Sequence, residues 1–121
     1  MLSVSLPIPP STNHLWRVVS RRVVRSRRYA AWRDQAADLL RTQLPRVTRY
    51  PVAVQVTIHG GRGWRADRDL DNVLKAVLDA LVASERLADD STQYVRSVRL
   101  DYRPPADTTA DAACLVSVEA I

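Results

Sequence analysis

Cysteine, glycine and lysine are scarce in this 121-residue chain, and each scarcity carries information. Cys114 is the only cysteine, so no disulfide can form within the chain and a reducing compartment is expected. It lies in an apolar run, which predicts a buried, unreactive thiol. No apolar run approaches the roughly 18 residues of a membrane span. The first seven residues also lack the basic leader of a signal peptide. We therefore expect a cytoplasmic protein with no membrane partner.

Arginine carries nearly all of the positive charge, because Lys75 is the only lysine. The formal net charge is +5 and the sequence pI is about 10.1. A basic protein suits a polyanionic partner, since binding releases the counterions condensed on nucleic acid, although a merely basic soluble protein has the same composition. The densest basic cluster predicts contacts with backbone phosphates or, alternatively, a solvated basic face; it comprises Arg21, Arg22, Arg25, Arg27 and Arg28.

Hydrophobic spacing predicts a small α/β protein of the α+β type, with a single domain over residues 1–121. Alternation predicts strands, and the basic stretch 17–25 is either a hairpin or a single strand; the strands are expected at 2–6, 52–59, 94–103 and 113–121. Apolar stripes at helical spacing predict helices over 27–44 and 70–83, with Trp32 in the core. The order β-β-α-β-α-β-β predicts a mixed sheet covered by two helices.

Charged side chains converge at the start of the second helix, in the run Arg-Asp-Leu-Asp-Asn-Val-Leu-Lys over residues 68–75. Asp69 and Asp71 flank the boundary where the backbone turns helical, so their carboxylates can converge on one point. Hard oxygen ligands of this kind suit Mg²⁺, with Mn²⁺ as a substitute. Lys75 lies one turn beyond Asp71 on the same face, where its ammonium can reach a phosphate oxygen. The pair Asp89-Asp90, in a later turn, offers a third carboxylate if that turn returns to the site.

A purely structural interpretation of these residues is also available. An aspartate at a helix start is favoured as a cap and by the helix dipole. Asp71, Lys75 and Asp79 could form an ion-pair ladder on a solvated face. The loop just upstream favours the metal site instead, because it gathers all three glycines of the chain with Arg62 and Arg65.

Three motifs in order resemble the RusA family of Holliday junction resolvases, over nearly the whole chain. Residues 7–13 read Pro-Ile-Pro-Pro-Ser-Thr-Asn, similar to the family's P-x-P-P-S-x-N segment. Residues 68–75 are similar to its R-D-x-D-N-x-x-K signature, and residues 87–90, Leu-Ala-Asp-Asp, resemble the pair of aspartates that closes its active site. The glycine-rich loop ahead of the site departs from the family pattern.

The resemblance implies a homodimer that cleaves four-way, branched double-stranded DNA by paired nicks in recombination and repair, with Mg²⁺ as cofactor. Carried over, Asp69, Asp71 and Asp90 would be the metal-binding and catalytic aspartates, and Lys75 the catalytic cation. Arg68 would contact DNA and offset developing negative charge. A non-catalytic binder of branched DNA or of RNA is the alternative, but carboxylates set among phosphate-seeking arginines would only repel its ligand.

Several other residues carry weaker expectations. Asn13 could line the substrate cleft or cap a loop. Arg62 and Arg65 of the glycine-rich loop are candidate DNA contacts. Trp64 could stack on an unpaired base at the junction centre, or pack as a lid or at a dimer contact. His59 could assist the nucleophile.

Overall fold

The computed structural model describes residues 2–10, 16–19, 22–25, 27–106 and 109–121, with only the backbone at 16–19 and 22–25. These described residues form two helices and six strands. The elements in chain order are β1 (Ser3–Pro7), β2 (Trp16–Val19), β3 (Arg22–Arg25), α1 (Arg27–Gln43), β4 (Val52–His59), α2 (Leu70–Ala83), β5 (Val95–Arg103) and β6 (Ala113–Ala120). The predicted class and order of elements are confirmed, and the basic stretch forms the hairpin β2–β3 rather than one strand.

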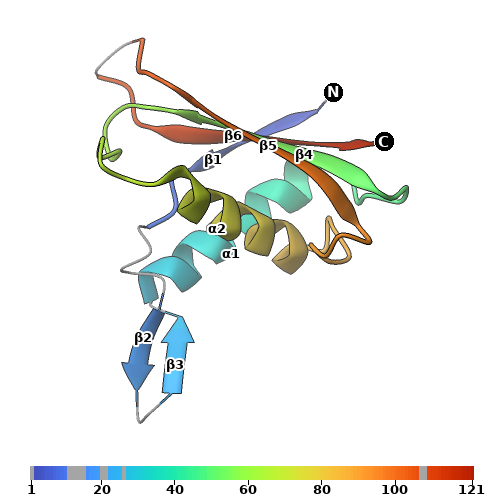
Figure 1. Cartoon of the computed structure of the whole chain (residues 1–121). Helices are drawn as coiled ribbons and strands as arrows, with labels where there is room; N and C mark the ends of the chain where they lie inside the picture. Colours follow the sequence, from blue (N-terminus) through green and yellow to red (C-terminus); the bar gives the residue numbers. More distant parts are fainter. Residues whose placement is uncertain (1, 11–15, 20–21, 26, 107–108) are drawn as a thin grey trace.

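The main sheet has four strands in the order β1-β6-β4-β5. β6 pairs antiparallel with both β1 and β4, whereas β4 and β5 are parallel. Parallel neighbours need a crossover connection, and α2 supplies it. The helix therefore begins at the end of the sheet where β4 finishes and runs back to the opposite end, where β5 begins (Figure 1).

Both helices cover the same face of this sheet (Figure 1). Every second side chain of β4 points toward the helices. These side chains are at most 1% exposed, and they belong to Val52, Val54, Val56 and Ile58. The apolar stripe of α2 meets them, and its buried residues are Val73, Ala76, Val77, Ala80 and Leu81. A single core between sheet and helices follows from these two periodicities.

The predicted core positions of Trp32 and Cys114 are confirmed, at 6% and 0% exposure. Burial raises the pKa of the Cys114 thiol to about 12, and the nearby Arg68 charge only partly opposes this. Helix α1 ends at Gln43, one residue before the predicted end, and Leu44 packs into the core beyond it. No helix in the described ranges is both long enough and apolar enough to cross a membrane.

The β2–β3 hairpin is a separate two-stranded sheet that projects away from the main sheet and its helices (Figure 1). In its register no arginine lies directly across from another arginine: Arg17 pairs with Val24, Arg22 with Val19 and Arg25 with Trp16. Since like charges directly opposite one another destabilise a strand pair, this register lets a basic hairpin form.

Candidate active site

Asp69 and Asp71 stand at the start of α2. Asp69 is the residue before the helix, with an extended backbone (φ −79°, ψ 141°), and its carboxylate makes no capping hydrogen bond. Asp71 lies in the first helical turn. Both side chains are exposed, and neither forms an ion pair with the part of the chain that is described. The capping interpretation therefore does not account for Asp69, and both carboxylates are free to bind a ligand.

Lys75 is exposed one turn further along α2 and forms no ion pair with any described residue. The ion-pair ladder suggested by its spacing is thus absent at this position. Asp79, the last member of that ladder, instead accepts a hydrogen bond from the Tyr29 hydroxyl of α1. Asp79 therefore helps to join the two helices, while Lys75 remains available at the surface.

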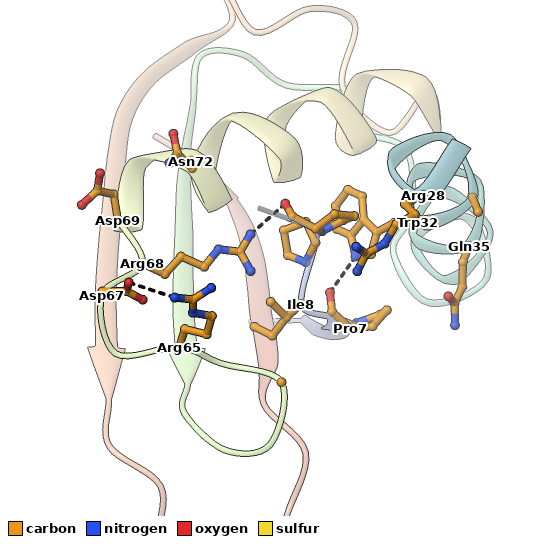
Figure 2. Close-up of a pocket in the computed structure, with 14 residues that line it drawn as sticks. Pro7, Ile8, Arg28, Trp32, Gln35, Arg65, Asp67, Arg68, Asp69 and Asn72 are labelled. Carbon is orange, nitrogen blue, oxygen red and sulfur yellow. Dashed lines mark hydrogen bonds and ion pairs between the residues drawn. The ribbon is translucent and has the colours of Figure 1, made fainter. Parts of the chain in front are cut away.

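Arg68 turns inward beside the two carboxylates. Its Nη2 donates a hydrogen bond of 2.9 Å to the carbonyl oxygen of Pro10 (Figure 2). Its guanidinium carbon lies 5.2 Å from the centre of the Trp64 ring. The Nε atom is buried and has no hydrogen-bond partner among the described residues. Burial lowers the pKa of Arg68, and its interaction with Cys114 partly opposes this shift. Arg68 thus links the site to the N-terminal proline segment.

The glycine-rich loop is tied to the segment before β6. The Arg62 amide donates to the Ala110 carbonyl and the Ala112 amide donates to the Arg62 carbonyl, each at 2.9 Å. Arg62 also pairs with Asp111 at 3.1 Å. Trp64 is half-buried and packs against Tyr102, with ring centres 5.7 Å apart. The proposed roles of Trp64, in stacking on a base, as a lid or at a dimer contact, stay predictions.

Asp90 lies at the other end of α2 from Asp69 and Asp71. The helix has 14 residues, which corresponds to about 21 Å at 1.5 Å per residue. Asp90 is exposed in the turn that leads from α2 to β5. Among the described residues, no three acidic, histidine or cysteine side chains lie close enough together to hold a metal ion. Of the three predicted aspartates, Asp69 and Asp71 thus share the start of α2 while Asp90 lies beyond its other end, and the three-aspartate set stays a prediction.

A cavity of about 780 Å³ adjoins the start of α2 (Figure 2). Three segments that are distant in sequence enclose it: residues 7–10, the first turns of α1, and the stretch from Gly63 to Asn72. The α1 wall consists of Arg28, Ala31, Trp32 and Gln35, whose spacing of three, four and seven residues defines one helical stripe. The stripe is visible in the sequence, but not the cavity that it faces.

The remaining predicted DNA contacts lie in three places. Arg27 and Arg28 are exposed at the start of α1, and Arg65 is exposed and pairs with Asp67 at 3.2 Å. For Arg22 and Arg25 only the strand backbone is described. Asn13 and Arg21 lie outside the described residues. His59 is exposed at the end of β4, and its role stays a prediction.

Comparison with known proteins identifies the family. The family model described as Endodeoxyribonuclease RusA matches residues 7–107. The crossover junction endodeoxyribonuclease RusA of Escherichia coli O139:H28 (strain E24377A / ETEC) is 34% identical over 102 residues, which cover 84% of this chain and 78% of the relative. The protein of the same name from Escherichia coli strain K12 is 33% identical over 90 residues, covering 74% and 73%. The matched region spans the proline segment, the carboxylate pair, Lys75 and Asp90, and this chain belongs to the RusA endodeoxyribonuclease family.

Proposed function

We propose that this protein is a metal-dependent endonuclease that resolves four-way (Holliday) DNA junctions by paired symmetric nicks. The observation that carries the proposal is the pair of exposed carboxylates at the start of α2, beside a lysine that forms no ion pair within the described residues. The names of the relatives, crossover junction endodeoxyribonuclease, supply the substrate class. Recombination and repair in the cytoplasm are the processes in which such junctions would be cut.

Mg²⁺, with Mn²⁺ as substitute, is the proposed cofactor. Asp69 and Asp71 fit it in donor chemistry, because exposed carboxylate oxygens are the ligands that these cations prefer. The bound ion would supply an activated water and would polarise the phosphoryl oxygen. Asp90 does not reach the pair within one chain, so a third aspartate has to come from a different arrangement of the protein.

The other charged residues act on the DNA itself. The Lys75 ammonium, one turn from Asp71, offsets the negative charge that develops on the phosphate in the transition state. Arg68 raises the local positive potential and, through its bond to Pro10, holds the N-terminal segment beside the site. Neither role requires Lys75 or Arg68 to form an ion pair with Asp69 or Asp71.

The DNA arms would lie along the basic surface. A two-stranded ribbon fits the major groove of B-DNA, and the projecting hairpin β2–β3 carries arginine at positions 17, 22 and 25. Arg27 and Arg28 continue this basic surface at the start of α1, on the way to the cavity. These contacts would be largely independent of DNA sequence and would weaken as salt concentration rises.

A homodimer is the proposed functional unit, because two symmetric nicks require two sites related by a two-fold axis. β5 lies at the open edge of the sheet, with Val98 and Tyr102 exposed at 41% and 38%. The turn with Asp90 precedes β5, and β5 finishes at the end of the sheet where α2 begins. Antiparallel pairing of two β5 strands would carry Asp90 of one copy toward the carboxylate pair of the other. Sedimentation of a monomer at micromolar concentration with full resolving activity would refute this arrangement.

The decisive experiment compares cleavage of a synthetic four-way junction with cleavage of linear duplex of the same sequence, with and without Mg²⁺. Wild-type protein should nick two opposing strands of the junction in Mg²⁺ only. Asp71→Asn removes a ligand charge at nearly constant size and removes repulsion toward phosphate, so junction affinity should be kept or raised while cleavage falls by orders of magnitude. Asp34→Asn, at an exposed aspartate of α1, is the matched control. Binding without any cleavage by wild-type protein would instead favour a non-catalytic DNA-binding protein.

A further inference from the structure

The cavity beside the carboxylate pair has the size and the walls of a ligand site. Its volume of about 780 Å³ falls within the range of roughly 300–1,000 Å³ found for small-molecule sites. Ile8, Pro9, Pro10 and Trp32 supply apolar surface, and Ala31, exposed on the α1 wall, leaves that space open. A flat apolar group of moderate size is what such walls would take.

Residues 7–10 form the floor of the cavity, and hydrogen bonds hold this floor in place from both sides. The Trp32 indole N–H of α1 donates a hydrogen bond of 2.8 Å to the Pro7 carbonyl, and Arg68 donates to the Pro10 carbonyl from the opposite side (Figure 2). Prolines have a fixed φ and no amide N–H to satisfy, so the floor between these bonds is stiff and apolar. A preformed site loses little conformational freedom when it binds.

The rim of the cavity offers charge and hydrogen bonds. Arg28 and Gln35 line it, and neither makes a hydrogen bond or ion pair with any part of the chain that the structure describes. Arg65, which pairs with Asp67, and Asn72 complete the rim. An unengaged guanidinium suits a phosphate, and an unengaged amide suits the hydrogen-bonding edge of a base. A nucleotide is the ligand class that uses an apolar floor, a cation and an amide together.

The location of the cavity indicates which nucleotide it would take. Asp69 and Asn72 belong to its lining, so an occupant would lie beside the proposed cutting site. A base inside continuous duplex is paired and stacked, and taking it out costs a few kcal/mol, least where pairing is already disturbed. We propose that this cavity receives one unstacked nucleotide from the branch point of the DNA, next to the phosphate that is cut. The inference rests on the proposed function and would give the protein its preference for branched over linear DNA.

The experiment places 2-aminopurine, whose fluorescence rises when it leaves the base stack, at each position flanking the branch of a four-way junction. Protein is added in EDTA, so that binding is observed without cleavage. We expect the 2-aminopurine fluorescence to rise severalfold at one flanking position of the junction and not to rise in linear duplex. Ala31→Leu, which fills the cavity from an exposed helical position, should abolish the rise and weaken junction binding by about tenfold, with duplex binding unchanged.

Ala83→Leu, the same change at an exposed position at the far end of α2, is the matched control and should behave like wild type. If the protein binds the junction but the fluorescence at every labelled position stays at the level of the free junction, the inference is refuted and the proposed function is not. The same would follow if Ala31→Leu kept the full rise. Protein that binds the junction no more tightly than duplex, and never cuts it in Mg²⁺, would refute the proposed function and the inference with it.

Discussion

Replacing Lys75 with alanine distinguishes the two roles that its position in the sequence allows. If the lysine stabilises the cutting transition state, its loss should slow cleavage and leave the fold intact. If it belongs to an ion-pair ladder, its loss should affect stability alone. In the structure Lys75 is exposed on α2 and forms no ion pair with any described residue, so little stability depends on it.

The expected magnitudes are far apart. An ion pair on a helix surface contributes about 0.2–0.5 kcal/mol, and alanine has the highest helix propensity. We therefore expect Lys75→Ala to change the free energy of unfolding by less than about 0.5 kcal/mol. Removing one group that stabilises transition-state charge costs about 2.7–4 kcal/mol, or a rate loss of about 10²–10³. Junction affinity should change much less than the cleavage rate.

Single-turnover cleavage of a labelled junction, gel-shift affinity in EDTA and thermal melting would be measured on the same preparations. Arg49→Ala is the control, because Arg49 is an exposed cation in the loop before β4 that makes no hydrogen bond or ion pair with the described residues. The reasoning fails if Lys75→Ala cleaves at nearly the rate of Arg49→Ala. It also fails if the slower cleavage comes with a loss of more than about 1 kcal/mol in unfolding free energy.

Two further predictions concern stability. Burial raises the folded-state pKa of Cys114 from its ordinary 9.0 to about 12, so the thiol of the unfolded chain ionises first as pH rises. The contribution of Cys114 to stability is therefore intact below about pH 9 and falls between about pH 9 and about pH 12. The fall is at most about 1.4 kcal/mol per pH unit. Urea unfolding of wild type and Cys114→Ala at about pH 8 and about pH 10 should therefore show a steeper fall for wild type, and parallel slopes would contradict the buried thiol. Gly61→Ala would press a Cβ against the backbone at Ala110 and Ala112, which cannot move aside, and should cost about 1–3 kcal/mol in the same assay. Gly63→Ala, with open space around it but φ of +89°, should cost only about 1–2 kcal/mol, and a larger loss at Gly63 than at Gly61 would show that the loop is not held as described.

The sequence by itself determined the elements and the local part of the site. The strict alternation of Val52, Val54, Val56 and Ile58 can bury one face only as a strand, and β4 spans residues 52–59 as predicted. The stripe of α2 likewise predicted a helix over residues 70–83, as found. The carboxylate pair and Lys75 lie within two helical turns, so their common location follows from helix geometry alone.

The tertiary structure decided what depends on contacts between distant segments. Asp90 is separated from Asp71 by the length of α2, because β4 and β5 are parallel and the crossover ends at the opposite edge of the sheet. Arg68 sits beside Asp69 in sequence, yet its guanidinium turns inward to the Pro10 carbonyl, 58 positions away. The cavity exists only where the proline segment, α1 and the loop before α2 meet. Local periodicity specifies which face of each element is apolar, whereas the packing of those faces decides which side chains finally meet.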